Sequence, residues 1–475
     1  MAINNPGRPM SRRRFLHGVV AVTGGVIVAQ LLAACGDDTA ANTPTIEAAG
    51  ATSGIPTQGG APAANAPATG GAASTLTLMM GEGEFSNDQL KAFTDANPSI
   101  AVERIPADEA QLKTLLDAGT PPDLIRTDGF RLANLAQRGL LLDLTDYFNA
   151  SALIKKDDLA PPSSYYQFQG GMYGMPKDWS PDYSLFVSST AFEQADVPVP
   201  STTKALTYPD LHELARKLTK RDGDKVTQMG YGYSFDTFVR IVQGILAQRG
   251  EKLYKPDFSA VVLKDNPAAT EILQYFFDIS KENVTWNPLS PSPSWAGDDF
   301  LKGILGICQL GYWYSAMITA DKEAIEKQKP VLLPAPSWDG KQRFNPTAAA
   351  VGLVIAKSTK NPDAAWQLFE YYMGGEPAKA RAASGWGVPG LKSLYSLMPR
   401  ETAFQRQVQE QLKDELQYAD RVLEANPNYD DTVFNQSWMA NLEPALRGTI
   451  TFDQLVAAIE RDCNAAITAG MAAKK

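Results

Sequence analysis

Carboxylates and aromatic side chains lie close together in several short segments of this 475-residue sequence. The clearest segment reads KDWSPDYS, from Lys177 to Ser184, and further pairings occur in GYGYSFDTF and QLGYWYS. Carboxylate oxygens accept hydrogen bonds from ligand hydroxyls, and flat aromatic rings pack against weakly apolar surfaces. Both groups suit a sugar, which presents hydroxyls in fixed directions and a weakly apolar ring face. The residue types therefore favour a binding site for such a solute.

Individual candidates carry competing interpretations. Asp236 is alternatively the cap of the helix that follows it, and the acids within Gly81–Glu84 are alternatively solvated loop residues. Trp386 lies between two glycines and has little local packing, which favours a ring that faces a cleft. Trp286 and Trp295, in a loop rich in Pro and Ser, are expected to be structural. The complete candidate set is Glu82, Glu84, Asp128, Asp178, Trp179, Asp182, Phe235, Asp236, Tyr312, Trp313, Trp338 and Trp386.

Histidine and cysteine are scarce, which limits the available catalytic chemistry. His212 is the one histidine beyond the amino-terminal segment, and we expect it on the solvent face of a helix. Cys308 and Cys463 are expected to be buried thiols, with a disulfide as the alternative. The sequence has no triad motif, CxxC spacing or nucleotide-binding loop, so we expect no cofactor, no metal ligands and no enzyme activity. A hydrolase using an acid pair such as Asp178 and Asp182 is the alternative.

The charge balance excludes one class of partner. The chain has 53 Asp and Glu against 44 Lys and Arg, and a net charge of −9. Phosphate backbones are bound by basic clusters, so nucleic acid is not an expected partner. Solubility is the simpler meaning of the charge. Several carboxylates facing one pocket would also suit a cationic solute or a metal ion, which leaves the solute class open.

The amino terminus resembles a lipoprotein export signal. The segment SRRRFL, from Ser11 to Leu16, is similar to a twin-arginine signal and precedes a short apolar run. LAAC, ending at Cys35, resembles a lipobox, in which this cysteine becomes the lipidated first residue; a plain signal peptide is the alternative. We expect residues 1–34 to be a signal peptide and residues 35–74, rich in Ala, Thr, Gly and Pro, to be a flexible tether. The mature protein would then be anchored at the extracytoplasmic face of a bacterial membrane.

The remaining sequence alternates between strand and helix patterns. Strands are predicted at 74–80, at 100–105 and from 122 onward, with helices at 108–119 and 131–148 between or after them. This alternation indicates a mainly parallel sheet in an α/β fold, in which ligands bind beyond the carboxyl ends of the strands. Gly81–Glu84 and the turn at 127–130 are predicted to lie at those ends. Later segments are mostly helical.

The order of landmarks resembles one known family. The segments STLTLMM, AGTPPDLIRTD, LAQRGLLLDLTDYF, GGMYGMPKDWSPDYSLFVSS, FLKGILGICQLGYWYS, PVLLPAP and AVGLVIAKSTKNPDAAWQLFEYYMGGEPAKARAASGWGVPG occur in this order from about residue 75 onward. They are similar to the extracytoplasmic solute-binding proteins of ABC importers, in the carbohydrate-binding group that includes maltodextrin-binding protein. The resemblance places Trp313 at the usual stacking position. Tyr312, Trp313 and Tyr314 follow a predicted strand, and in an extended segment not all three would face one cleft.

The resemblance implies a two-lobed periplasmic-binding-protein fold, similar to type II, that closes around a solute by a hinge motion. Its implied function is capture of a mono- or oligosaccharide, and its implied partners are the transmembrane subunits of an ABC permease. We expect a monomer that contacts the membrane through lipid on Cys35. The implied crossovers between the lobes lie at 185–188, 332–338 and 391–400. Lobe 1 would contain 75–185 plus 338–392, and lobe 2 would contain 189–332 plus 393–475.

Overall fold

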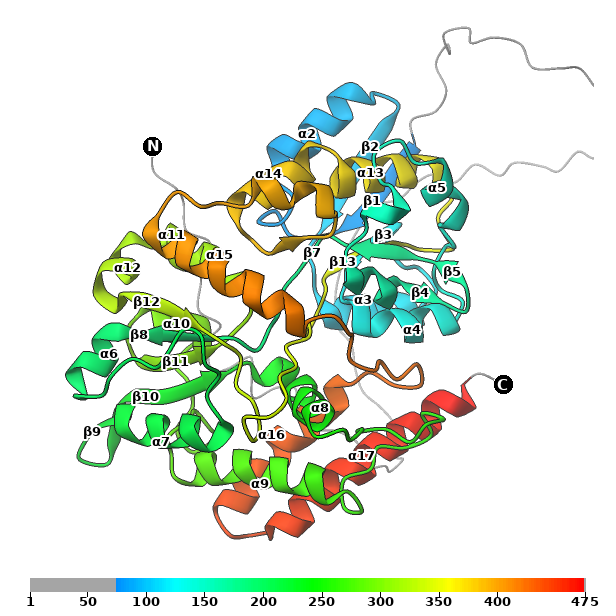
Figure 1. Cartoon of the computed structure of the whole chain (residues 1–475). Coiled ribbons are helices and arrows are strands. Elements are labelled where there is room, and N and C mark those ends of the chain that lie inside the picture. Colours follow the sequence, from blue (N-terminus) through cyan, green and yellow to red (C-terminus); the bar gives the residue numbers. More distant parts are fainter. Residues whose placement is uncertain (1–73, 474–475) are drawn as a thin grey trace, which may run out of the picture. The chain divides into compact units, whose positions relative to one another are not determined.

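The computed structural model describes residues 74–473 of the chain (Figure 1). The predicted signal peptide, the lipidation of Cys35 and nearly all of the predicted tether lie outside these residues. Two five-stranded sheets organise the described part. Among residues 74–473, every helix is too short or too polar to cross a lipid bilayer.

The first sheet is built from the amino-terminal strands and one strand that returns from much later in the sequence. Strand β1 pairs in parallel with β2 along its whole length, from Ser74 opposite Ile100 to Met79 opposite Ile105. Strand β13 pairs antiparallel with both β3 and β6, which completes the sheet. The strand order is β2 (Ile100–Ile105), β1 (Ser74–Met79), β3 (Leu124–Thr127), β13 (Gly352–Ile355) and β6 (Gly174–Pro176).

The second sheet uses the central part of the chain. Strand β10 pairs in parallel with β11, while β8 pairs antiparallel with β11 and β12. Every residue of β8 and β11 is buried, as expected for strands covered on both faces. The strand order is β12 (Pro330–Leu333), β8 (Leu185–Ser188), β11 (Leu305–Gln309), β10 (Lys225–Tyr233) and β9 (Lys220–Asp222).

Helices begin at the residues that the capping pattern predicts. Ser86, Thr207, Thr402 and Thr451 each form a capping box with the third residue of the following helix. The α-helices are α2 (Asn87–Ala96), α3 (Glu109–Asp117), α4 (Gly129–Gln137), α5 (Thr145–Ala150), α6 (Ser189–Gln194), α7 (Tyr208–Leu218), α8 (Phe238–Gln248), α9 (Pro267–Lys281), α10 (Ala296–Leu301), α11 (Tyr314–Ala320), α12 (Lys322–Gln328), α13 (Pro362–Gly374), α14 (Glu376–Ser384), α15 (Ala403–Glu415), α16 (Thr432–Leu446) and α17 (Phe452–Ala472).

Short pairings and 3-10 turns complete the described chain. Strands β4 (Gln167–Phe168) and β5 (Gly171–Met172) form a short hairpin. Strand β7 (Asp178–Trp179) pairs with β14 (Val388–Pro389), which joins two segments that are distant in sequence. The 3-10 helices are η1 (Lys156–Asp158), η2 (Pro161–Tyr166), η3 (Phe235–Thr237), η4 (Lys392–Leu397) and η5 (Leu416–Tyr418).

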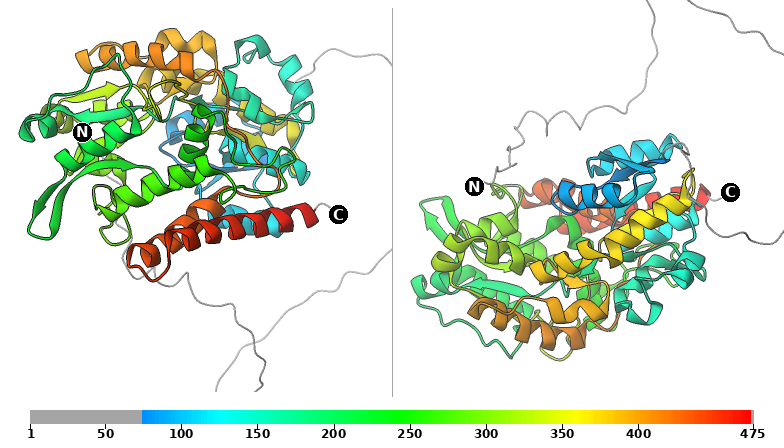
Figure 2. Two further views of the ribbon diagram at one scale, coloured as in Figure 1. Left: turned by 60° about the horizontal axis from the view of Figure 1, so that its bottom comes forward. Right: turned by 90° about the horizontal axis from the view of Figure 1, so that it is seen from above.

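Each sheet has its own helical cover. Helix α13 packs against β1 and β13 of the first sheet, and its buried face includes Trp366 and Phe369. Helices α7, α10 and α15 pack against strands of the second sheet. Helices α8, α9, α16 and α17 pack together (Figure 2). The side chain of Trp438 in α16 is fully buried in their core.

The first crossover is predicted near Leu185–Ser188; this segment is strand β8 of the second sheet, and the chain passes between the sheets just before it, at residues 180–184. One sequence prediction about this region needs correction. His212 does not face solvent: its side chain is 14% exposed, and Nε2 lies 3.0 Å from Oε2 of Glu282. Cys308 and Cys463 are both free and buried, which confirms the thiol interpretation. The lobe boundaries remain a prediction.

Gly230 in β10 allows a close approach between the second sheet and helix α7. A Cβ atom at this position would lie 1.9 Å from the carbonyl oxygen of Ala215. We expect Gly230→Ala to lower the free energy of unfolding by about 1–3 kcal/mol, because backbone must move to relieve the overlap. Urea denaturation measures the loss. Gly83→Ala is the control, since a Cβ there meets no atom within 4 Å; equal effects from the two variants would contradict the packing account.

Candidate functional site

A cavity of about 340 Å³ is lined by segments attached to both sheets. From the first sheet come Glu84 after β1, Arg126 in β3 and the wall segment Thr347–Ala350, which precedes β13. Near the second sheet, Ser234, Asp236 and Thr237 follow β10, and Gln309, Leu310, Gly311 and Trp313 lie at and after the end of β11. The cavity therefore lies where strands of both sheets end, as expected for ligand sites in α/β folds. The lining also includes Lys177, Asp178, Trp179, Ser180, Asp182, Tyr183, Ile241, Trp295, Val351 and Trp386.

Three tryptophans form one side of the lining. The rings of Trp295 and Trp313 are nearly parallel, with an interplanar angle of 11° and centroids 6.0 Å apart. The ring of Trp386 lies 6.0 Å from Trp313 at 44°. Gly385, at φ 74°, ends α14 in the left-handed conformation and directs the chain into Trp386, which is 37% exposed. This arrangement presents flat apolar surface to a ligand ring.

A chain of paired charges forms another part of the lining. Arg126 Nε donates to Oε1 of Glu84 at 3.0 Å, and Nζ of Lys177 lies 3.2 Å from the other oxygen of Glu84. Lys177 also pairs with Asp178, and Nε of Arg381 lies 4.0 Å from Asp178 Oδ2. The two Nη groups of Arg126 have no partner within the described residues, so they are available to a ligand.

Burial and ion pairing shift the pKa values of Glu84 and Lys177 in opposite directions. Burial raises the pKa of Glu84, but the cations of Lys177 and Arg126 outweigh it and hold that pKa below its ordinary value. Burial lowers the pKa of Lys177, but Asp178 and Glu84 together raise it above its ordinary value. The buried lysine and Glu84 therefore stay charged near neutral pH.

Asp182 lines the cavity, yet its carboxylate is already occupied. Oδ1 accepts a hydrogen bond from Ser180, while Oδ2 accepts from Thr347 Oγ1 at 3.1 Å and from the backbone N–H of Ala348 at 2.6 Å. Burial raises the pKa of Asp182 to about 6, against the lowering effect of these hydrogen bonds. Asp182 therefore holds the cavity wall in position through these hydrogen bonds.

The structure places only part of the predicted set on the cavity lining. Asp236 is exposed there, and its carboxylate has no partner in the part of the chain that the structure describes. Whether any of these side chains binds a solute stays a prediction. The predicted residues on the lining are Glu84, Asp178, Trp179, Asp182, Asp236, Trp313 and Trp386.

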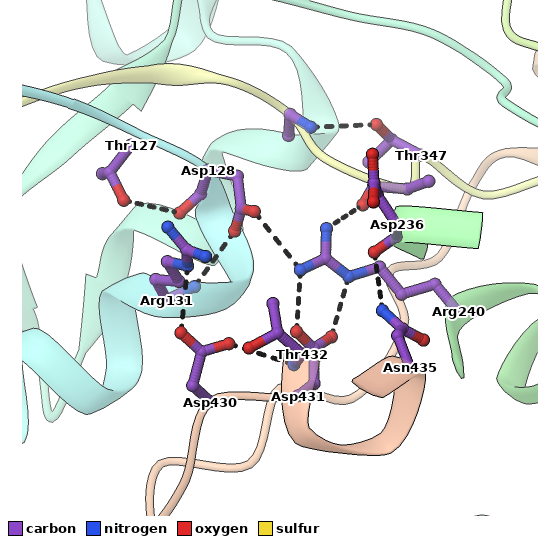
Figure 3. Close-up of polar contacts among 12 residues, drawn as sticks. Thr127, Asp128, Arg131, Asp236, Arg240, Thr347, Asp430, Asp431, Thr432 and Asn435 are labelled. Atoms are coloured by element: carbon purple, nitrogen blue, oxygen red, sulfur yellow. Dashed lines mark hydrogen bonds and ion pairs between the residues drawn. The ribbon is translucent and has the colours of Figure 1, made fainter. Parts of the chain in front are cut away.

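The other predicted residues lie off the lining and have protein partners instead. Asp128 caps α4 and pairs with Arg240 (Figure 3), and Glu82 accepts a hydrogen bond from Asn87. The remaining three are aromatic residues. Phe235 packs on Tyr233, Tyr312 is buried with its hydroxyl bonded to Gln409, and Trp338 packs on Tyr208 and Tyr275.

Sequence reasoning missed several lining residues. Trp295, expected to be structural, lines the cavity with its ring beside Trp313. Arg126 is the penultimate residue of β3, so its position near a strand end was a usable signal. Lys177 gave no such signal, because only the tertiary pairing shows its role. Within residues 74–473, no group of three or more His, Cys, Asp or Glu is arranged to hold a metal ion.

The raised pKa of Asp182 predicts a specific pH dependence of stability. A folded pKa of about 6, against 3.8 ordinarily, means that the folded state keeps the proton which the unfolded state releases. The stabilisation of the folded state by this proton is complete below pH 3.8 and is lost as pH rises through 6. Asp182→Asn should therefore gain stability relative to the native protein between pH 4.5 and 7.5, by about 2 kcal/mol. Urea denaturation at both pH values measures the difference; a pH-independent difference would contradict the assignment.

Comparisons with known proteins agree with this geometry. A search of curated proteins finds no match. The structure is similar to an ABC substrate-binding protein from Listeria monocytogenes in complex with cycloalternan, with a TM-score of 0.71, 20% identity and coverage of 83% of this chain and 99% of that chain. It is also similar to an ABC transporter solute-binding protein from Thermotoga lettingae bound with alpha-D-tagatose, with a TM-score of 0.67, 19% identity and coverage of 83% and 100%.

The sugar-binding protein MalE from Xanthomonas citri gives a TM-score of 0.63 at 17% identity, with coverage of 83% of this chain and 98% of that chain. Likeness at this level of identity establishes the fold, which is the predicted two-lobed periplasmic-binding-protein fold. Family membership rests on a sequence model. The model for bacterial extracellular solute-binding proteins matches residues 80–378, which is more than half of the chain. This chain therefore belongs to the bacterial extracellular solute-binding protein family.

Proposed function

We propose that this protein captures a mono- or oligosaccharide in the tryptophan-lined cavity and delivers it to the permease of an ABC importer. The observation that carries the proposal is the combination of Trp295, Trp313 and Trp386 with polar groups on one lining. Flat rings bind the apolar face of a sugar, and carboxylate or guanidinium groups bind its hydroxyls. The named ligands of similar structures, cycloalternan and tagatose, are themselves carbohydrates.

Two groups on the lining are free to bind sugar hydroxyls. The Nη groups of Arg126 are donors, and the carboxylate of Asp236 is an acceptor, without partners among the described residues. They belong to segments attached to different sheets. A solute that binds both would favour the state in which the two sheets lie close together, which is the differential affinity that hinge closure requires.

The cellular location of the protein is part of the same proposal. The twin-arginine and lipobox patterns within residues 1–35 support export and lipid anchoring through Cys35 at the extracytoplasmic face of the membrane. Such an anchor would keep a monomeric binding protein close to its permease. Mass spectrometry of the membrane fraction tests this part, because a diacylglycerol adduct on Cys35 is the expected result.

Solute binding can be tested by intrinsic fluorescence. Adding maltotriose, mannotriose, tagatose and glucose in turn should change tryptophan emission and raise the melting temperature for at least one sugar. Spermidine and Mg²⁺ are included because the acidic lining also suits cations. A clear response to spermidine or Mg²⁺ with none to any sugar would contradict the carbohydrate assignment and favour a cationic solute.

Trp313 should carry much of the affinity for the panel sugar that binds best. Trp313→Ala is expected to weaken binding by roughly tenfold or more, because the ring loses its stacking surface. Trp338→Ala is the matched control, since it removes the same side chain at a position away from the lining. Isothermal titration calorimetry measures both variants. Equal losses would contradict a stacking role.

An acid-pair hydrolase is the alternative, and the geometry disfavours it. Asp178 is paired with Lys177, and both oxygens of Asp182 accept hydrogen bonds from the protein. Neither carboxyl group is therefore free to transfer a proton to a substrate. Turnover of nitrophenyl glycosides that disappears in Asp182→Asn would reverse this conclusion.

A further inference from the structure

The wall segment Thr347–Ala350 lines the cavity, so its conformation helps to shape the site. Ala350 adopts a left-handed conformation at φ 46°, which is rare for a residue other than glycine. Backbone held in such a conformation persists only where its surroundings fix it, and such strain is common at ligand sites. Particular side chains must therefore hold this segment in place.

One side of the wall segment is held by Asp182, which accepts hydrogen bonds from Thr347 Oγ1 and the Ala348 N–H. The other side is held by Arg240, which donates from Nη1 to the carbonyl oxygen of Ala348. Arg240 is not on the cavity lining, and its side chain is 3% exposed (Figure 3). It reaches the cavity only through the wall segment.

Arg240 also links elements that belong with different sheets. Its Nη2 lies 3.2 Å from Oδ2 of Asp128, which caps α4 directly after β3 of the first sheet. Its Nε and Nη2 bind the two oxygens of Asp431, just before α16, at 2.8 and 2.9 Å. The guanidinium also lies 4.0 Å from the ring centroid of Phe130. We call these contacts of Arg240 with Asp128, Asp431 and Phe130 the junction. A planar, permanently charged guanidinium with five donors can make all of these contacts, and lysine would not replace it.

We propose that Arg240 is a positioning residue for the solute pocket: without touching the solute, it fixes the wall segment relative to α4 and α16, and thereby sets affinity. For affinity, this inference rests on the proposed function. Its structural part does not, because the order of the wall segment is measurable without a ligand. The Asp128 contact links the first sheet to the wall through Arg240, beside the direct hydrogen bond from Gly129 N–H to Ala349 O at 2.9 Å.

Asp128→Asn is the decisive variant, because it removes one charge and leaves the rest of the junction in place. Asparagine still caps α4 through Oδ1 but presents an amide donor to Arg240 instead of an acceptor. Asp430→Asn is the matched control. It removes the neighbouring pair between Asp430 and Arg131, at 3.3 Å, which does not contact the wall segment.

Hydrogen exchange followed by mass spectrometry gives the ligand-free readout. The backbone N–H groups of Ala348 and Ala350 donate to side chains of Asp182 and Thr347, so peptides spanning residues 347–351 should be protected. In Asp128→Asn we expect about tenfold faster exchange in these peptides, with unchanged exchange in β10. Asp430→Asn should leave both regions unchanged. A purely structural role would instead lower the melting temperature without selective exchange at the wall, and would overturn the proposal.

Affinity gives the second readout, with maltotriose and mannotriose as the probes. We expect Asp128→Asn to bind them about tenfold more weakly than the native protein, and Asp430→Asn to bind them equally well. Unchanged affinity in Asp128→Asn, or equal losses in both variants, would overturn the proposal. Should neither sugar bind the native protein, that result counts against the proposed function alone, and the exchange measurement decides the role of Arg240. Arg240→Met should give the larger effect on exchange, and if it fails to fold, Asp128→Asn still decides.

Discussion

The cavity depends on one constraint: the backbone polar groups of the wall segment must be satisfied while the chain passes between two sheets. Buried N–H and C=O groups without partners are costly, so a passage of this kind needs side chains that bind them. Here Asp182 accepts from Ala348 N–H, Arg240 donates to Ala348 O, and Tyr166 donates to Ala350 O at 2.9 Å. Three side chains from separate elements thus hold a segment that has no regular secondary structure of its own.

The same logic explains how buried charge is tolerated around the cavity. Isolated buried charges are strongly unfavourable, and a buried ion pair is stable only when its geometry is good and its remaining groups are bonded. Lys177 lies between two carboxylates, and Arg240 lies between Asp128 and Asp431. Asp182, which has no cation as a direct partner, is the exception. Burial raises the pKa of the Asp182 carboxyl group, so protonation below neutral pH removes part of the free-energy cost of burying the charge.

Local patterns in the sequence predicted most of the fold. Strand β2 matches the predicted segment residue for residue, because runs of β-branched and apolar residues act over a short stretch of chain. The first crossover was predicted only to within a few residues, near Leu185–Ser188, since a short apolar run does not reveal which sheet it joins. The position of β13 between β3 and β6 likewise depends on contacts between residues far apart in sequence.

The site was less predictable than the fold, for a physical reason. Trp386 was a candidate because an aromatic residue between two glycines has little local packing to occupy it, and Trp313 because the family resemblance places it at the usual stacking position. Asp128 and Asp182 were identified as ligand-binding candidates from their residue type, but their oxygens are used by Arg240, by backbone N–H groups and by hydroxyls. A sequence shows that a carboxylate exists; only the tertiary structure shows whether it is already occupied.

The central claim is that the tryptophan-lined cavity closes on a sugar and releases it unchanged. A crystal structure of the protein with the solute retained from purification tests this most directly. The account predicts an intact sugar whose ring lies against Trp313, with hydroxyls bound by Arg126 or Asp236. A solute bound elsewhere, a cleaved product, or a non-carbohydrate ligand in this cavity would contradict it.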